Sequence, residues 1–204
     1  MFEDKAKQLL KIDLKFSDED IEKLEIFENL LLDYNKKYNL ISKSTENLIW
    51  NRHILDSAQL INHFNISEPS KLADFGSGAG FPGFILAIFN KNPNFHVKLY
   101  EKSPVKRAFL KKIKDKLEIN VQIAENVDEG EIDANIVVSR AFKKIDKIIN
   151  ISRERIRKPH KIIILKGKNA QAAINNVSLG SNYSYKIKNS ITDADSKIIV
   201  INVS

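Results

Sequence analysis

Apolar residues in the first third of the chain recur every three or four positions, which is the spacing of an amphipathic helix. Ser17 followed by Asp20 is typical of a capping box at the start of the longest of these runs. The predicted helices lie at residues 3–12, at residues 21–38 beyond this capping box, and from about residue 44 to a point before Pro69. Residues 1–66 are therefore expected to form a helical region.

From residue 70 onward the pattern changes to short apolar runs that alternate with helical spacing. The predicted strands lie at residues 72–75, 95–100, 121–124, 134–139 and 161–166, and two alternating runs without a helix between them follow at residues 183–188 and 197–203. Five strand–helix units before a hairpin predict an α/β fold with an open, mostly parallel sheet and one C-terminal antiparallel strand. Residues 67–204 are expected to form this second domain.

The first predicted strand ends in a glycine-rich loop, DFGSGAGFPG, which spans Asp74 to Gly83. Glycines allow tight turns and a close approach of a ligand, and the free N–H groups of a following helix favour a carboxylate or phosphate. Gly78, Gly80 and Gly83 satisfy the dinucleotide pattern G-x-G-x-x-G. Asp74 with Gly76, Gly78 and Gly80 instead fits the loop that binds S-adenosylmethionine. A turn without any ligand is the third interpretation.

Residues outside the loop decide between these cofactors. Glu101 ends the second predicted strand, where an acidic residue can bind ribose hydroxyls. The terminal hairpin, and the lack of a second substrate domain, favour S-adenosylmethionine over a dinucleotide. Because ligands of open α/β sheets lie outside the carboxyl ends of the strands, the site is expected there. The side chains at those ends include Ala124, Glu125, Arg140 and Lys166.

Composition and charge limit the kinds of partner that the protein is expected to bind. The chain of 204 residues has no cysteine, which excludes disulfides and thiolate metal sites, and no metal site is predicted. It carries 33 basic and 26 acidic residues, but residues 1–66 carry nine basic and twelve acidic ones. The excess of positive charge therefore falls on the sheet domain and suggests a nucleic acid partner. No signal peptide or membrane span is expected, and we predict a cytoplasmic monomer.

The residues also limit which atom could accept a methyl group. Methylation at pyrimidine C5 normally needs a cysteine nucleophile, which this chain lacks. The Asn/Asp-Pro-Pro-Tyr loop used for exocyclic amines is absent after the fourth strand, where Ser139-Arg140-Ala141 stands instead. A ring nitrogen with a free lone pair, such as guanine N7, needs no general base. These residues alone do not single out N7.

Several short motifs, in order and spacing, resemble the bacterial small-subunit ribosomal RNA guanine-N7 methyltransferases, a family also called methyltransferase G or glucose-inhibited division protein B. The matching pieces are Tyr38-Asn39-Leu40 with Ser42, Arg52-His53-Ile54-Leu55-Asp56-Ser57, the loop from Asp74 to Gly83, Lys106-Arg107 with Phe109-Leu110, Ser139-Arg140-Ala141-Phe142 and Leu165-Lys166-Gly167. The resemblance covers nearly the whole chain. It implies methylation of a guanine in the decoding region of 16S RNA, and leaves open whether the substrate is naked RNA, the 30S subunit or an assembly intermediate.

The resemblance also implies roles for particular residues. It places cofactor contacts on Gly76, Phe81, Ala124, Glu125 and Arg140, to which we add Gly78 and Glu101. Arg140, Asn39 and His53 are the expected catalytic residues, and the resemblance suggests Asp56 as a further residue of the site.

Lys106, Arg107 and Lys166 are expected to bind RNA. The chain departs from the family at Ile123 and at Ser196, where arginines are usual. The alternatives are an RNA-binding module with a vestigial cofactor fold, or a methyltransferase for another RNA base.

Overall fold

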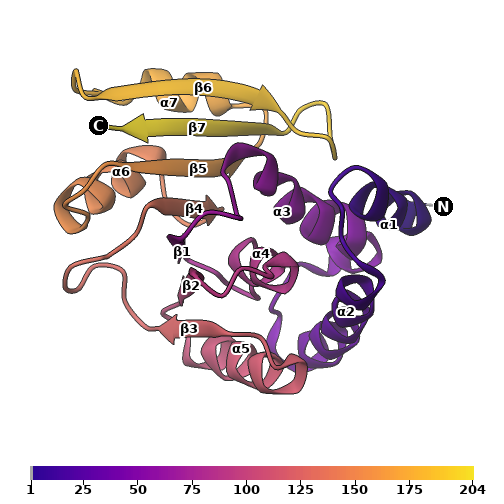
Figure 1. Ribbon diagram of the computed structural model, residues 1–204. Coiled ribbons are helices and arrows are strands. Elements are labelled where there is room, and N and C mark those ends of the chain that lie inside the picture. Colours follow the sequence, from indigo (N-terminus) through magenta and orange to yellow (C-terminus); the bar gives the residue numbers. More distant parts are fainter. Residues whose placement is uncertain (1) are drawn as a thin grey trace.

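The computed structural model describes residues 2–204. Two regular helices open the chain, α1 (Phe2–Ile12) and α2 (Asp18–Tyr38), as the spacing predicts (Figure 1). The capping box is present: the Ser17 hydroxyl accepts from the Asp20 N–H, and the Asp20 carboxylate accepts from the Ser17 N–H. Lys91 also pairs with the buried Asp20 carboxylate at 2.6 Å. The cap therefore joins the helical region to the loop before the second strand.

The prediction of the third helix as a single regular element is wrong. The segment instead contains η1 (Lys43–Leu48), a π-helical stretch η2 (Trp50–Leu55), α3 (Asp56–Ala58) and η3 (Gln59–His63). A π-turn widens the helix and changes which side chains share a face. Arg52 pairs with Asp193 and not with Asp56, which lies four positions further along the chain.

The rest of the chain forms one seven-stranded sheet in the order β3-β2-β1-β4-β5-β7-β6. The strands are β1 (Ser70–Phe75), β2 (Phe95–Tyr100), β3 (Val121–Ala124), β4 (Ile136–Arg140), β5 (His160–Lys166), β6 (Tyr183–Asn189) and β7 (Lys197–Val203). The first five pair in parallel, and β7 pairs antiparallel with both β5 and β6. This arrangement confirms the predicted mostly parallel sheet with an antiparallel C-terminal strand.

Helices follow four of the first five strands. They are α4 (Gly83–Phe89), α5 (Pro104–Leu117), α6 (Ile145–Arg155) and α7 (Ala170–Asn175). The expectation of five strand–helix units is wrong at the third, because residues 125–135 run from β3 to β4 without a helix. This segment contains Gly130 and many acidic residues, and it lacks an apolar helical stripe.

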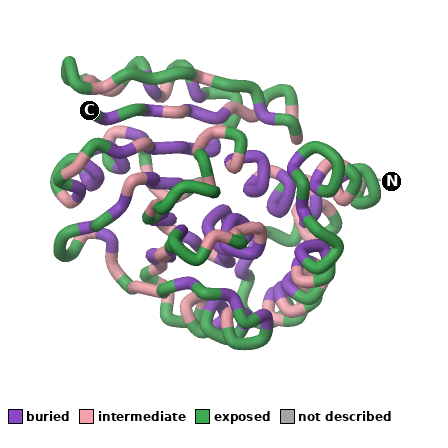
Figure 2. Tube along the Cα trace, in the orientation of Figure 1, coloured by how far each residue is buried: buried purple, intermediate pink, exposed green. Residues whose placement is uncertain are grey.

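The helices cover the two faces of the sheet with separate cores. One core joins α1, α2, α4 and α5 to Leu72, Leu99 and Val138. The other joins α6 and α7 to Phe75 and Val137. Alternate residues of each central strand thus enter opposite cores, and α4 is buried along nearly its whole length (Figure 2). Among the described residues, no helix has the length and apolar composition to cross a membrane.

We expect Gly83→Ala to lower the free energy of unfolding by about 1–3 kcal/mol. A Cβ at this position would lie 2.6 Å from the Leu99 side chain and 2.7 Å from that of Asp74. This overlap outweighs the better helix propensity of alanine. Urea unfolding measures the change. Gly167→Ala is the control, because its Cβ would meet no atom within 4 Å; equal stability of the two variants would contradict the packing argument.

Candidate functional site

A cavity of about 750 Å³ opens at the carboxyl ends of the central strands, which is the edge that the sequence predicts. Its walls come from the glycine loop, from the loops after β2, β3, β4 and β5, from the segment before α3, and from the β6–β7 loop. Its polar lining includes Thr45, Arg52, His53, Asp56, Ser77, Glu101, Lys106, Glu125, Arg140, Lys166, Thr192 and Ser196. This volume lies in the range of small-molecule sites.

The glycine loop shapes the cavity through close backbone contacts. Gly76 adopts φ +75°, and a Cβ there would lie 2.2 Å from the Phe142 ring. The Gly78 N–H donates to the Glu101 carboxylate at 2.8 Å. Gly76 therefore allows Phe142 to pack on the loop, while Gly78 fixes the carboxylate at the end of β2. Both glycines line the cavity.

The expected anion at the N-terminus of α4 comes from the protein and not from a ligand. Asp74 is fully buried, and its carboxylate accepts the Gly83 N–H at 2.9 Å. Its other oxygen has no hydrogen-bond partner in the described chain. Burial raises the pKa of Asp74 to about 7, against the opposing effect of the Gly83 hydrogen bond. Gly83 completes the dinucleotide pattern, but in the structure it allows close packing and donates the N–H that the Asp74 carboxylate caps.

Hydrogen bonds hold the two acidic side chains, Glu101 and Glu125, at one end of the cavity. The two Glu101 carboxylate oxygens accept from the N–H groups of Gly78 and Ser103, each at 2.8 Å. The Arg107 guanidinium donates to the Glu101 carbonyl at 2.9 Å and pairs with Glu125 at 3.0 Å. These contacts orient Glu101 and Glu125 toward one compartment. Arg107 itself does not line the cavity.

The opposite end of the cavity is positively charged. The Arg140 guanidinium lies 4.7 Å from the centre of the Phe81 ring, and it donates to the Arg52 carbonyl at 3.1 Å. No ion pair to Arg140 occurs in the described residues. Burial lowers the pKa of Arg140, and the nearby charges of Asp56 and Asp74 act in the opposite direction. Arg140 therefore keeps most of its donors available to a ligand.

His53 packs against the same aromatic ring. Its ring centre lies 5.0 Å from that of Phe81, and its Nε2 lies 2.9 Å from the Thr45 hydroxyl. Burial lowers the pKa of His53 to about 3, and the charges of Arg140 and Arg52 add to this effect. The imidazole is therefore neutral at physiological pH and is a weak base.

Asp56 and Gln59 join the helical region to the β6–β7 loop. The Asp56 carboxylate accepts from Ser190, Thr192 and Gln59. The Gln59 side chain also accepts the Ile191 N–H at 2.9 Å.

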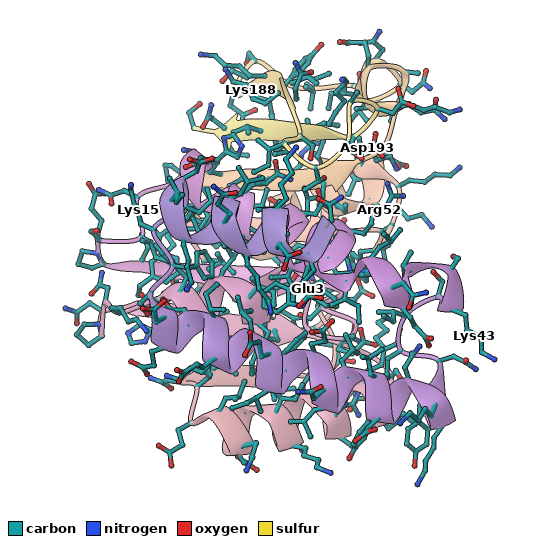
Figure 3. All side chains as sticks on the ribbon, turned by 90° about the vertical axis from the view of Figure 1, so that its right-hand side faces the viewer. Glu3, Lys15, Lys43, Arg52, Lys188 and Asp193 are labelled. Carbon is teal, nitrogen blue, oxygen red and sulfur yellow. The ribbon has the colours of Figure 1, made fainter. Side chains whose placement is uncertain are left out.

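An ion pair of 2.7 Å between Arg52 and Asp193 adds to this connection, and Figure 3 shows the two residues close together between the N-terminal helices and the C-terminal loop. Sequence reasoning missed Gln59, Ser190 and Thr192. Gln59 lies more than 130 positions before Ser190 and Thr192, and no local spacing links it to them.

The structure brings most of the predicted site residues together. Gly76, Gly78, Phe81, His53, Asp56, Glu101, Lys106, Glu125, Arg140 and Lys166 all line the cavity. Ala124 lies at the end of β3 behind Glu125 and is not in the lining. Asn39 is exposed in a left-handed conformation at the end of α2, and only its neighbours Leu40 and Ile41 line the cavity.

The reversed β7, the glycine loop after β1 and the acid at the end of β2 define the fold and site of a methyltransferase that uses S-adenosylmethionine. Solved structures share this fold at low sequence identity. A putative S-adenosylmethionine-dependent methyltransferase from Methanococcus maripaludis aligns with TM-score 0.57 and 18% identity, over 78% of this chain and 89% of that one. A methyltransferase from Pyrococcus furiosus aligns with TM-score 0.59 and 12% identity, over 74% and 82%.

Sequence comparison identifies the family. The model of the family described as rRNA small subunit methyltransferase G matches residues 20–199. Ribosomal RNA small subunit methyltransferase G of Rickettsia prowazekii is 39% identical over 93% of this chain and 97% of that protein. The corresponding protein of Pelagibacter ubique is 33% identical over 90% and 88%. The chain belongs to the rRNA small subunit methyltransferase G family, which confirms the predicted enzyme class and its methyl donor, S-adenosylmethionine.

Buried Asp74 makes stability depend on pH in a defined window. Its pKa is about 7 in the folded protein and about 3.9 in an unfolded chain. Between these values the folded state keeps a proton that the unfolded state has lost. The free energy of unfolding therefore falls as pH rises from about 4 to about 7, by on the order of 1 kcal/mol per pH unit, and levels off above.

Asp74→Asn keeps an acceptor for Gly83 and removes this titration. Urea unfolding of both proteins from pH 4 to 8 should show the difference between them narrowing, or reversing, as pH rises to about 7. Parallel stability curves would contradict a shifted pKa for Asp74.

Proposed function

We propose that this protein transfers a methyl group from S-adenosylmethionine to N7 of a guanine in the decoding region of 16S ribosomal RNA. The observation that carries the N7 assignment is the lack, among the residues that the structure describes, of a suitable base at the positive end of the cavity. His53 has a pKa of about 3, and the Asp56 carboxylate is held by Ser190, Thr192 and Gln59. Methylation of N7 uses a free lone pair and releases no proton, so it needs no such base.

The two ends of the cavity suit the two reactants. Glu101 is oriented by backbone N–H groups at the end of β2, where a carboxylate can accept from ribose hydroxyls. Glu125, with Ala124 behind it, follows at the end of β3 and would flank the adenine. The glycine loop lies between this end and Arg140. We assign the β2–β3 end to the nucleoside of the cofactor and the Arg140 end to methyl transfer.

The bound cofactor would supply an electrophilic methyl group, which N7 takes with its lone pair while the carbon–sulfur bond breaks and its electron pair stays on sulfur. The protein mainly has to align the acceptor nitrogen with that bond. Arg140 fits this task, because it is fixed by the Arg52 carbonyl and the Phe81 ring and still has free donors. It would bind a carboxylate or phosphate of the reactants.

The RNA would approach over the rim of the cavity, where Lys106 and Lys166 are half-buried and contribute positive charge. As ribosomal RNA is the substrate, we place the reaction in the cytoplasm.

Tritiated S-adenosylmethionine with 30S subunits from a strain that lacks this methylation tests the function. We expect label at one guanine, and mapping of the modified base should place the methyl group on N7. Calorimetry on the same preparation measures cofactor binding. Absence of cofactor binding would instead favour an RNA-binding module with a vestigial cofactor fold, and label on another atom would refute the N7 assignment.

In this assay Arg140→Ala should reduce kcat/KM by at least about a hundredfold, as expected for the loss of a charged group that aligns reactants. The matched control is Arg157→Ala, because Arg157 is exposed and lies outside the cavity lining. Thermal unfolding shows whether each variant is folded. Full activity of a folded Arg140→Ala protein would remove Arg140 from the proposed machinery.

Lys106 and Arg107, predicted together as RNA-binding residues, should behave differently. Lys106 lines the cavity and has no ion-pair partner among the described residues, whereas Arg107 is held by Glu101, Lys102 and Glu125. Lys106→Ala should reduce the slope of log K against log salt for RNA binding by about 1. Arg107→Ala should leave that slope unchanged and weaken cofactor binding. Equal changes in salt slope would contradict this division.

A further inference from the structure

Tyr38 presents an exposed aromatic ring at the end of α2, beside the cavity. Its side chain is 50% exposed, and the proposed methyl transfer assigns no role to it. Asn39 ends the helix in a left-handed conformation, and the next residue, Leu40, lines the cavity. Because two residues of chain span at most about 7 Å, the backbone of Tyr38 lies at the rim of the cavity.

The ring of Tyr38 is held from one side by other aromatic rings. Its centre lies 5.7 Å from that of Tyr34, which in turn lies 5.1 Å from the fully buried Phe109 of α5. The Lys112 ammonium lies 5.0 Å from the centre of the Tyr34 ring. Tyr38 is therefore anchored to the core through Tyr34, while half of its surface stays open to solvent.

The chain between this ring and the cavity is also held in place. The Ile41 N–H donates to the side-chain oxygen of Asn35 at 2.9 Å, and the Asn35 amide donates to the Glu46 carboxylate. Asn35 is only 2% exposed. These buried hydrogen bonds fix the distance between the exposed ring and the cavity wall.

This wall extends to the end of the cavity that we assign to methyl transfer. Thr45, which lines the cavity with Leu40, contacts His53 at 2.9 Å. His53 packs on the Phe81 ring, and Arg140 lies 4.7 Å from the centre of the same ring. Tyr38 thus stands outside the compartment in which the acceptor base would bind.

Unpaired positive charge accompanies the exposed ring. Lys37, Lys43 and Lys112 are exposed and have no ion-pair partner among residues 2–204, and Figure 3 shows Lys43 extending from the surface. Asp33, the acid of the same helix turn, pairs with Lys36 at 2.8 Å. An aromatic ring among free ammonium groups is the combination that binds single-stranded nucleic acid, because bases stack on the ring and phosphates attract the cations.

We propose that Tyr38 is a stacking platform for an unpaired nucleotide next to the target guanine, with Lys37, Lys43 and Lys112 near its phosphates. This inference rests on the proposed function and extends it to a further positioning residue. A base must leave its stack to enter an enzyme cavity, and its neighbour then loses a stacking partner. The Tyr38 ring supplies a new one at the rim and so lowers the cost of presenting the guanine.

Four variants separate stacking from other roles of the side chain. Y38F keeps the ring, Y38L keeps an apolar side chain without a ring, and Y38A removes both. The matched control is Y185A, because Tyr185 is 39% exposed on β6 and lies outside the cavity lining. Thermal unfolding identifies folded protein for each variant.

The experiment measures kcat/KM on 30S subunits and the Kd of two single-stranded oligoribonucleotides. One carries the target guanine with its natural neighbours, and the other has abasic sites on both sides of the guanine. We expect Y38A and Y38L to bind the first about tenfold more weakly, the value of one stacked base, and to show a similar loss of kcat/KM. Y38F and Y185A should stay within about twofold of the wild type.

The abasic oligonucleotide and salt give readouts that a merely structural role would not produce. Y38A should bind the abasic oligonucleotide as the wild type does, because the base that it would release is absent. The slope of log K against log salt should stay unchanged in Y38A, since stacking displaces no counterion, and should fall by about 0.7 in K112A.

Other outcomes overturn the proposal in distinguishable ways. Equal losses of Y38A on both oligonucleotides would give the ring a packing role only, and wild-type affinity of Y38L would exclude stacking. Wild-type protein that binds the two oligonucleotides equally, or neither, would also refute it. A loss on 30S subunits alone would assign the surface to a ribosomal protein. If the wild type labels no guanine N7, the proposed function fails; if it does and Y38A is fully active, only the role of Tyr38 fails.

Discussion

The buried carboxylate of Asp74 accepts the N–H of Gly83 at the start of α4, and the geometry of the glycine loop depends on this contact. Because the carboxylate completes the helix start from inside the protein, the glycine loop between them closes into a fixed turn. Gly83 must lack a side chain for the carboxylate to fit. The cost is a carboxylate in an apolar core, which the shifted pKa of Asp74 reflects. The loop in turn fixes Glu101 through Gly78.

A second connection completes the cavity from segments that are far apart in the sequence. Asp56 and Gln59 hold the β6–β7 loop against the helical region, and both segments contribute lining residues. The network is largely satisfied by internal hydrogen bonds, so it specifies one arrangement of the two segments. The helical region therefore forms a wall of the site, and it also shares an apolar core with the sheet.

Charge divides the cavity in a way that matches methyl transfer to a neutral base. Acidic groups lie at the ends of β2 and β3, and Arg140 lies beyond β1 with neutral His53 beside it. A site of this kind offers orientation and electrostatic fit and has little capacity to remove protons. Such chemistry suits a nucleophile that already has a free lone pair, and selection of the base then has to come from hydrogen bonds around its edge.

The sequence determined the sheet and the position of the site, because apolar periodicity, glycine spacing and the acid after the second strand are local signals. It placed β2, β3 and β7 at their observed bounds, and the resemblance carried by its motifs led to the family. Only the tertiary structure decided the π-turn around Arg52, the pairing of that residue with Asp193, and the contacts of Gln59 with the β6–β7 loop. It also showed that the Arg107 guanidinium donates to the Glu101 carbonyl and that Nδ1 of His53 has no hydrogen-bond partner among the described residues. The contacts of Arg52 and Gln59 join segments more than a hundred residues apart, and local spacing does not record such contacts.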